Sequence, residues 1–320
     1  MRGDLSAICR VLREKGRFLI ACHENPEGDA IGSELALALA LRKMGKTATV
    51  LNADPVPANL LFLPGADTVV FTEDGSKYDV AVVLDCGSPE RTGRVGRELR
   101  KCPLLVNIDH HRTNGDLGEL ALVDPDAAAT GLLIHRVLSA MGYEIDLDVA
   151  TNIYVAVLTD TGSFHYGSSS PEAFEVAGDM VRRGVDPWAV AEQALEAQSA
   201  HRLRLLGRVL DSLEVSDGGR VACITTMQED LREFASGKDA LEGFINFPRS
   251  IVGVEVAVSF REEEGGVFRV SFRSKGRVDV SAVAARFGGG GHRNAAGCAV
   301  PGTLADVKKR VQEALAAVLP

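Results

Sequence analysis

Apolar strand patterns and helical patterns alternate through the first third of the chain. The run RFLIAC at 17–22 is almost wholly apolar, and a helical pattern follows it at 30–44. Further apolar runs lie at 47–52, 79–86 and 104–109. Strands that are apolar on both faces and alternate with helices are typical of a parallel sheet. The pattern therefore predicts an α/β domain built on a parallel sheet, preceded by a short amphipathic helix within 1–16.

The periodicity changes twice in the rest of the chain. It becomes helical after about 126, with segments at 127–141, 146–159, 171–184 and 186–212. Strand patterns then return at 213–217, 221–226, 251–260 and 267–274, followed by helical patterns at 281–287 and 304–319. We therefore expect a second, smaller α/β domain. The predicted boundaries are 1–197 for the first domain, 198–212 for a helical linker and 213–320 for the second domain.

The composition is that of a globular protein with substantial cores. Hydrophobic residues make up 46% of the 320 positions, which supports two domains. No apolar run approaches the roughly 20 residues that span a bilayer, so no membrane partner is expected. The six cysteines form no CxxC pair and lie mostly in apolar surroundings. Reduced, buried thiols of this kind favour a cytoplasmic location.

The charge is distributed unevenly along the chain. The net charge of −9 argues against long duplex nucleic acid as a partner, because such binding depends on neutralising phosphates with Lys and Arg. Residues 1–212 contain 21 basic and 30 acidic residues, whereas residues 213–320 contain 14 of each. Within the second part, RVSFRSKGR at 269–277 is locally basic. A small anionic substrate therefore fits this chain better than a duplex.

Acidic and histidine residues gather where the predicted strands and helices end. His23 follows the first apolar run, Asp85 ends the run AVVLD, and Asp109 ends the run LLVNID. Open parallel sheets bind ligands beyond the carboxyl ends of their strands, so we expect these three residues at one edge of the sheet. The full set of candidates in four clusters is His23, Glu27, Asp29, Asp85, Asp109, His110, His111 and Asp160.

The residue types in these clusters indicate a centre for two divalent metal ions. Imidazole and carboxylate ligands without thiolates suit manganese, magnesium, iron or zinc, and carboxylate-rich sites favour the harder ions. Two ions about 3.5–4 Å apart activate water and stabilise in-line displacement at phosphorus. A bridging carboxylate is then needed, and Asp85 at a strand end is rigid enough for it. Each residue also has a structural interpretation: turn residues at Asp85 and Asp160, helix caps at Glu27 and Asp29, and a buried histidine at His23.

A glycine run near the C-terminus offers a second kind of site. The segment GGGGHRNAAG at 288–297 places consecutive backbone N–H groups and His292 in a predicted loop. Such a composition suits close approach by a phosphate. A flexible turn explains the glycines equally well, but the basic stretch at 269–277 favours phosphate binding.

Taken together, these segments resemble the DHH phosphoesterase family with its C-terminal DHH-associated domain. The motifs HxxPxxDA, VLDC, DHH, DTGSF and GGGGHxxAAG occur in the family's order and span nearly the whole chain. Within the family, the resemblance is to stand-alone enzymes that act on short oligoribonucleotides and on pAp. The implied fold is a parallel-sheet DHH domain joined by a helical connector to a smaller α/β domain.

The resemblance implies roles for single residues of the first domain. One metal ion is expected at His23, Glu27 and Asp85, and the other at Asp29, Asp85, His110 and Asp160. Asp109 is expected to orient His110. His111 is expected to face the scissile phosphate, where it stabilises charge or protonates the leaving oxygen.

The resemblance also implies substrate contacts and one departure from the family. The expected contacts to the 5′ phosphate or base are Arg273, Ser274, Gly290, Gly291 and His292, with Arg249 as a helper. The family usually has Asp where this chain has Glu27. The extra methylene moves the carboxylate by about one bond, so the ion at His23 is expected to bind more weakly or to be a different metal. We expect activity to survive.

The implied reaction is attack on the phosphate carried by the 3′ oxygen of a nucleotide whose 5′ phosphate is held by the second domain. Short oligoribonucleotides would be degraded from the 5′ end to 5′ mononucleotides, and pAp would give AMP. The implied cofactors are two divalent metal ions, manganese first and magnesium as the alternative. The implied partners are short single-stranded oligonucleotides and pAp, and a homodimer is left open.

Other functions remain open at this point. The first is hydrolysis of cyclic di-AMP or pApA, which sequence does not separate from the main hypothesis. The second is a nucleotide-binding regulator with weak catalytic activity, in which Glu27 would be the first metal ligand to depart from the family's pattern. A single-strand DNA exonuclease usually carries a further nucleic-acid-binding domain, and a pyrophosphatase of this family lacks the GGGGH motif.

Overall fold

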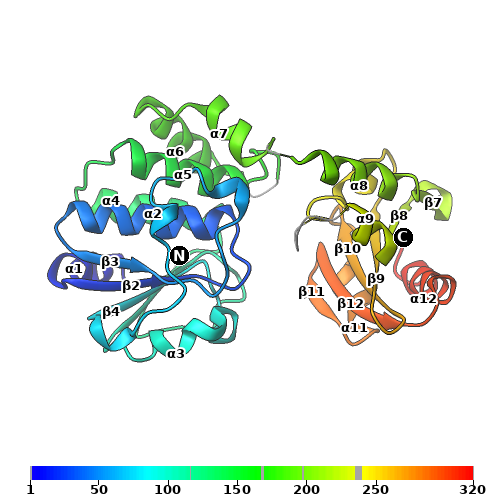
Figure 1. The fold of residues 1–320 in the computed structure, drawn as a ribbon, viewed down its shortest axis with the longest axis horizontal. Coiled ribbons are helices and arrows are strands. Elements are labelled where there is room, and N and C mark those ends of the chain that lie inside the picture. The colour runs from blue at the N-terminus through cyan, green and yellow to red at the C-terminus, as the bar shows by residue number, and fades with distance from the viewer. Residues whose placement is uncertain (1, 116, 167–168, 197, 235–239, 320) are drawn as a thin grey trace. The chain divides into compact units, whose positions relative to one another are not determined.

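The chain forms two compact units, Met1–Ala197 and Gln198–Pro320. The computed structural model describes residues 2–115, 117–166, 169–196, 198–234 and 240–319. We call the two parts the first unit and the second unit and describe each by itself (Figure 1). Within the described ranges, no helix is long and apolar enough to cross a membrane.

A mixed sheet with a parallel centre forms the middle of the first unit. In the described part of the unit the strand order is β1-β6-β5-β4-β2-β3. All neighbours pair in parallel except β1, which is antiparallel to β6. The predicted α/β architecture is confirmed. The strands are β1 (Arg2–Gly3), β2 (Arg17–Ala21), β3 (Thr47–Val50), β4 (Val80–Leu84), β5 (Leu105–Asp109) and β6 (Leu120–Val123).

The longer helices cover one face of this sheet, together with Leu60 and Ala66 of two short turns, and other short turns cover the opposite face. In Figure 1, α2, α4 and α5 lie above the sheet and α3 lies below it. The longer helices are α1 (Leu5–Glu14), α2 (Gly28–Lys43), α4 (Thr130–Ala140), α5 (Leu147–Asp160), α6 (Pro171–Arg182) and α7 (Pro187–Ala194). The shorter ones are η1 (Ala58–Leu60), η2 (Ala66–Thr68), η3 (Gly75–Lys77), η4 (Pro89–Val95) and α3 (Gly96–Leu99).

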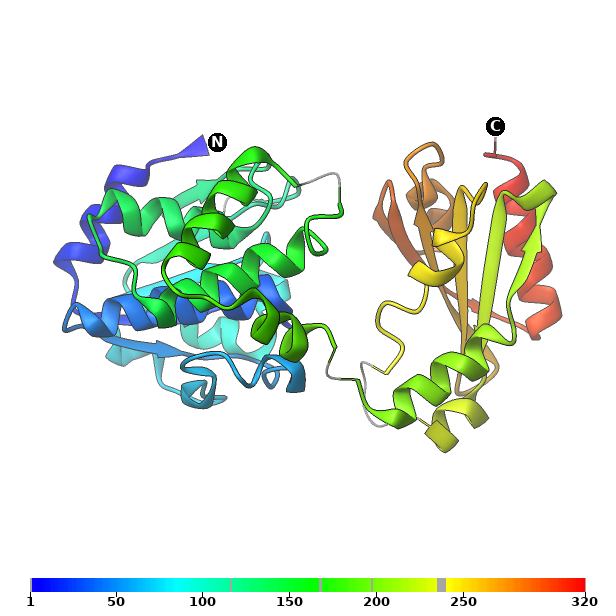
Figure 2. The ribbon, with the colours of Figure 1, turned by 90° about the horizontal axis from the view of Figure 1, so that it is seen from above.

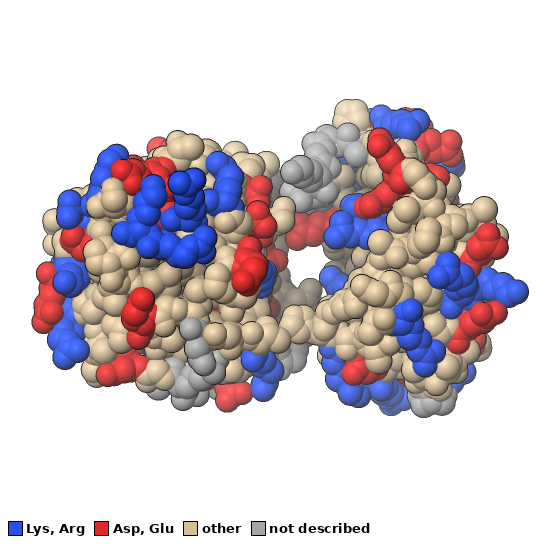
Figure 3. Space-filling view, turned by 90° about the horizontal axis from the view of Figure 1, so that it is seen from below, with Lys and Arg blue, Asp and Glu red and all other residues tan. Residues whose placement is uncertain are grey.

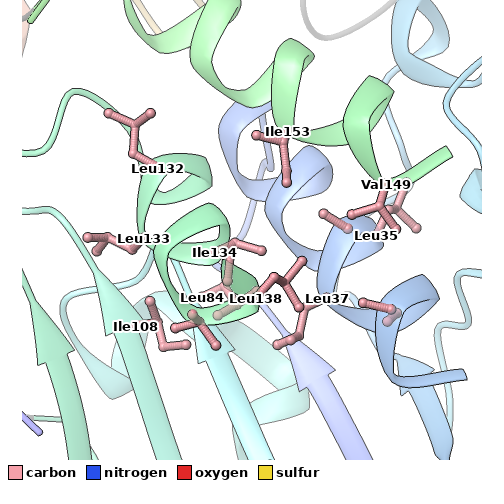
Figure 4. Close-up of a cluster of buried hydrophobic side chains, with 14 of the residues drawn as sticks. Leu35, Leu37, Leu84, Ile108, Leu132, Leu133, Ile134, Leu138, Val149 and Ile153 are labelled. Atoms are coloured by element: carbon pink, nitrogen blue, oxygen red, sulfur yellow. The ribbon is translucent and has the colours of Figure 1, made fainter. Parts of the chain in front are cut away.

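Alternate residues of each central strand enter two different cores. In β4, Val80, Val82 and Leu84 join the core beneath α2, α4 and α5, whereas Ala81 and Val83 join the core beside η4 and α3. Burial on both faces explains why these strands are continuous apolar runs in the sequence. Figure 4 shows how the larger core is filled, with side chains of α2, α4 and α5 meeting those of β4 and β5.

Helices α2 and α5 pack unusually close together. A Cβ atom built on Gly32 of α2 would lie 2.5 Å from the backbone oxygen of Asn152 in α5, and one on Gly28 would lie 2.4 Å from Oγ1 of Thr159. No side chain larger than hydrogen fits at such distances without movement of a neighbour. The close approach brings together the two helices whose ends carry Asp29 and Asp160.

The second unit is a mixed sheet between two helical layers. The described part of its sheet has the order β11-β12-β10-β9-β8-β7, in which β8 and β9 are parallel and the other neighbours are antiparallel. One face packs on α12, as Figure 2 shows. The strands are β7 (Glu214–Ser216), β8 (Val221–Thr226), β9 (Val256–Glu263), β10 (Val267–Ser274), β11 (Gly290–His292) and β12 (Ala295–Pro301). The helices are α8 (Ala200–Leu210), α9 (Gln228–Phe234), α10 (Asn246–Ser250), α11 (Val280–Ala285) and α12 (Leu304–Ala316).

The structure differs from the predicted elements in four respects. The single helix expected at 186–212 is two helices, α7 and α8. Helix α8, expected as part of a linker, packs on the second unit, because Leu205 and Val209 contact Ile224 and Phe244. The glycine run expected as a loop forms the edge strand β11, which pairs with the unpredicted strand β12. Strands β1 and β6 were also not predicted; β1 has only two residues and shows no period.

Candidate metal centre

Three residues of the predicted site lie at the ends of three neighbouring strands. Strands β5, β4 and β2 are adjacent in the sheet, and they lead to Asp109, Asp85 and His23 at their carboxyl ends. Asp85 is 2% exposed and has a positive φ of 53°. This left-handed conformation is uncommon for a residue with a side chain and marks functional positions when the surrounding structure enforces it. The strand-end convergence expected from the sequence is therefore present.

His23, Glu27 and Asp85 form one group of possible ligands, here called the His23 group. Each offers one atom such that all of these atoms lie within 4.8 Å of one another. Nε2 of His23 lies 3.5 Å from Oδ2 of Asp85, and Nδ1 lies 2.7 Å from the backbone oxygen of Glu24. The buried Nε2 has no hydrogen-bond partner among the described residues. A ring held through Nδ1, with Nε2 unpaired beside a carboxylate, is a donor arrangement that suits a cation.

Asp29, His110 and Asp160 form a second set, the His110 group, under the same 4.8 Å limit. Nε2 of His110 lies 3.7 Å from Oδ2 of Asp29 and 3.5 Å from Oδ2 of Asp160. It also lies 3.5 Å from Oδ1 of Asp85. Asp85 thus directs one oxygen toward His110 and the other toward His23. This is the geometry that a carboxylate bridging two cations requires.

The N-terminus of helix α4 holds the buried carboxylate of Asp29. The backbone N–H groups of Thr130 and Gly131 donate to Oδ2 and Oδ1 of Asp29 at 2.7 and 2.9 Å. The hydroxyl of Thr130 donates to Oδ1 of Asp85 at 3.0 Å. The first N–H groups of a helix have no partner within it and favour negative charge. Thr130 was not identified from the sequence.

Like charges in the centre compete for protons. Burial, together with Asp85 and Asp160, raises the pKa of Asp29 well above its ordinary value. Burial also raises the pKa of Asp160 to about 6. Burial alone would lower the pKa of His110, but Asp29, Asp160 and Asp85 raise it to about 9. A divalent cation would replace these protons and neutralise the carboxylates. This set of donors is therefore suited to binding a metal ion.

His111 is oriented by Asp109, which corrects one expectation. Nδ1 of His111 donates to Oδ1 of Asp109 at 2.7 Å, whereas Nδ1 of His110 faces the backbone oxygen of Ala127 at 3.1 Å. The expectation that Asp109 orients His110 is therefore wrong. The cause is local: after β5 ends, the chain turns so that His111, two residues on, folds back over the Asp109 carboxylate.

Asn114 completes this hydrogen-bonded network and was missed in the sequence. Its Nδ2 donates to Oδ2 of Asp109 at 2.6 Å and to Oδ1 of Asn107 at 2.7 Å. Burial would raise the pKa of Asp109, but the hydrogen bonds from His111 and Asn114 and the charge of His111 lower it. Asp109 is therefore an ionised, fully buried acceptor, which is the role of a residue that positions an imidazole.

In the second unit, the strand register places Arg273 and His292 on one face. Arg273 of β10 pairs with Ala295 of β12, and Ala295 pairs with His292 of β11. Residues directly opposite one another in neighbouring strands point to the same side of the sheet. A small alanine therefore separates a guanidinium from an imidazole. Ser274 is buried, and its hydroxyl donates to Oδ1 of Asn294 at 3.2 Å.

The glycines of β11 have a packing function. A Cβ on Gly291 would lie 2.5 Å from the backbone oxygen of Ala295, and one on Gly289 would lie 2.2 Å from that of Gly297. Gly290 has no atom within 4 Å of such a Cβ and is exposed. Arg249 lies in α10, which contacts strands β8, β9 and β10. The glycine run thus serves close strand pairing and leaves Gly290 open.

Two family models match the chain. The model described as the DHH family, N-terminal domain, matches residues 17–161, and the DHHA1 domain matches residues 223–319. All candidate ligands of the His23 and His110 groups lie in the first match. Arg273, Ser274 and the glycine run lie in the second.

The similar proteins agree with these matches. The chain is 35% identical over 306 residues to the bifunctional oligoribonuclease and PAP phosphatase NrnA of Thermus thermophilus, covering 94% of this chain and 90% of that protein. It is 25% identical to the protein of the same name from Bacillus subtilis, over 87% of each chain. An exopolyphosphatase-related protein of Bacteroides fragilis has a similar solved structure, with a TM-score of 0.92, 29% identity and coverage of 98% of this chain and 95% of that one.

Proposed function

The chain belongs to the DHH family of phosphoesterases and carries the DHHA1 domain, and from this premise we propose that it hydrolyses short oligoribonucleotides and pAp. Oligomers are cleaved from the 5′ end to 5′ mononucleotides, and pAp gives AMP and phosphate. The two substrates share a nucleotide with a 5′ phosphate and a second phosphate on its 3′ oxygen. One binding geometry therefore serves both.

The observation that carries this proposal is the position of Asp85 between two ligand groups. Its two oxygens face His23 and His110 at 3.5 Å each. We propose that the His23 group holds one divalent ion and that the His110 group together with Asp85 holds the other, with manganese preferred because the donors are carboxylates and imidazoles. When bound, such ions supply Lewis-acid stabilisation of charge on the phosphoryl group and activate water.

The protein's own residues then have separate tasks. His111, fixed through Nδ1 by Asp109, presents Nε2 as the proton donor to the 3′ oxygen that leaves. Asp109 stabilises the protonated ring without taking up its proton. In the second unit, Arg273 and His292 bind the 5′ phosphate, since a guanidinium pairs with phosphate oxygens in a bidentate manner. Ser274, Gly290, Gly291 and Arg249 are proposed as further substrate contacts.

We also propose that Glu27 is a competent ligand in place of the family's usual Asp. It stands at the N-terminus of α2 without capping the helix. Its carboxylate is within 4.8 Å of the ligand atoms of His23 and Asp85. A side chain that is exposed and does no capping is free to approach a cation.

Product analysis tests the proposed function. The purified protein is incubated with manganese, or with chelator as control, on pAp, 5′-phosphorylated RNA di- to pentamers, a 24-mer and cyclic di-AMP. We expect mononucleotides from the short oligomers and AMP from pAp. Turnover of cyclic di-AMP alone would contradict the proposal, and binding without turnover under every metal condition would identify a regulator instead.

A further inference from the structure

Basic residues are concentrated in one short segment of an otherwise acidic unit. Residues 1–197 contain 18 Lys and Arg against 29 Asp and Glu, yet five of the 18 lie within 91–101. These five are Arg91, Arg94, Arg97, Arg100 and Lys101. Figure 3 shows a group of Lys and Arg side chains on the face of the first unit that lies below the sheet in Figure 1, the side that carries α3.

The four arginines recur every third residue and are all exposed. We call Arg91, Arg94, Arg97 and Arg100 the arginine row. The residues between them include Thr92, Val95 and Leu99, which are buried at 2–3% exposure. The row runs through η4 and α3 to Arg100, the residue after α3, and Gly93 kinks the segment with a φ of 58° and a ψ of −141°. The segment therefore packs on its apolar side and presents guanidinium groups to solvent.

Most of the arginine row has no structural partner. Arg94 anchors the segment, since it donates to the backbone oxygens of Ala53 and Phe71. The side chains of Arg91, Arg97 and Arg100 have neither a hydrogen bond nor an ion pair among the described residues. Lys101 differs, because Glu98 lies 2.6 Å from its Nζ. Three positive charges are thus left available in a unit with excess acid.

The arginine row begins at the metal centre. The backbone N–H of Glu24 donates to the oxygen of Arg91 at 2.7 Å, and the oxygen of Glu24 faces Nδ1 of His23 at 2.7 Å. Gly93 fixes this contact, since its φ is +58° and a Cβ there would lie 2.1 Å from Oε1 of Glu24. The start of the row is therefore two hydrogen bonds away from a candidate metal ligand.

We propose that the arginine row binds the phosphates of the oligonucleotide that follow the scissile bond on its 3′ side. This inference rests on the proposed function, in which the second unit binds the 5′ nucleotide and the scissile phosphate lies at the metal centre. A chain that leaves the centre along the first unit would meet the excess acid of that unit, which repels it. Single-stranded nucleic acid is held by cationic tracks along its backbone, and the row begins beside the centre at Arg91 and leads away from it through α3.

The test compares substrates with and without a 3′ extension. The double variant Arg97→Gln/Arg100→Gln is assayed with manganese on pAp and on a 5′-phosphorylated RNA pentamer. We expect kcat/KM for the pentamer, divided by that for pAp, to fall about 10-fold through KM. Each lost phosphate contact also lowers the slope of log(kcat/KM) against log[salt] by about 0.7 for single strands. The pentamer slope should therefore become shallower by about 1.4.

A matched variant controls for net charge. Arg10→Gln/Lys15→Gln removes two exposed positive charges from the region of α1, which holds none of the candidate ligands, and should leave the ratio unchanged. An unchanged ratio in the Arg97/Arg100 variant would overturn the inference, as would an equal loss with pAp. Failure of the wild type to hydrolyse either substrate would instead contradict the proposed function. In that case, the fluorescence anisotropy of a labelled RNA pentamer, measured in chelator, tests binding by the row without catalysis. Equal affinity of the Arg97/Arg100 and Arg10/Lys15 variants for the pentamer would overturn the inference.

Discussion

Nδ1 of His111 donates a 2.7 Å hydrogen bond to Oδ1 of Asp109, and this contact fixes the ring that faces Asp85. Because Asp109 is fully buried and ionised, it selects the tautomer with Nδ1 protonated and stabilises the imidazolium.

Asp109→Asn should therefore lower kcat for pAp by roughly 10²–10⁴-fold, the range of a lost general acid, while the KM changes little. Manganese binding, followed by thermal shift, should stay close to wild type. A parallel loss of manganese binding would show that Asp109 supports the metal centre rather than His111.

Asp85→Asn should remove metal binding from both ligand groups, since Asp85 faces both His23 and His110. Saturating manganese at about 100 times its Kd stabilises the wild type by about 2.7 kcal/mol, and this gain should vanish together with hydrolysis. Manganese content and thermal unfolding measure the two effects. The control is Asp67→Asn, an exposed carboxylate at η2. Near-normal turnover in Asp85→Asn would disprove the assigned centre.

Arg273→Ala should raise KM for pAp about 10-fold or more with a small effect on kcat, because a bidentate phosphate contact is worth on the order of 1.5–3 kcal/mol. Arg269→Ala is the matched control, since Arg269 lies four residues earlier on the same face of β10. Steady-state kinetics of both variants test this prediction. An equal rise in KM in the two variants would mean that KM depends on the overall charge of the second unit and not on a contact made by Arg273.

Glu34→Gln should change how stability depends on pH. Burial raises the pKa of Glu34 to about 8, although Asn52 donates a hydrogen bond to it. The protonated form is thus favoured in the folded state, so its stabilisation is complete below the unfolded pKa of about 4.5 and is lost as pH rises toward 8.

The variant cannot ionise at this position and should gain stability relative to wild type across that window. The free energy of unfolding in urea and chelator, measured from pH 5 to 8.5, gives the difference. A constant difference would show that Glu34 ionises normally.

Gly32→Ala should destabilise the first unit by about 1–3 kcal/mol, since its Cβ would meet the backbone oxygen of Asn152 at 2.5 Å. Manganese affinity should fall as well, because α2 and α5 carry Asp29 and Asp160. Gly207→Ala in α8 is the control: no atom lies within 4 Å of its Cβ, so the better helix propensity of alanine should stabilise by about 0.5–1 kcal/mol. Denaturant unfolding of both variants tests the pair, and a neutral Gly32→Ala would refute the tight contact.

The sequence by itself determined the parallel sheet of the first unit and the identity of the candidate ligands. Strands apolar on both faces are a local pattern, and the rule that parallel strands present ligands at their carboxyl ends places His23, Asp85 and Asp109 together without coordinates. Strand β1 was not predicted because its two residues carry no periodicity.

Only the tertiary structure decided which side chains pair. Asp29 is held by Thr130, 101 positions away, and no local pattern encodes a contact at that separation. His111, not its neighbour His110, bonds Asp109, because the path of the chain after β5 sets the direction of each ring. Packing between distant segments likewise decides the burial of Glu34, the pairing of β11 with β12 and the exposure of the arginine row. The sequence gives the type of each residue, whereas the packing sets the environment of its side chain.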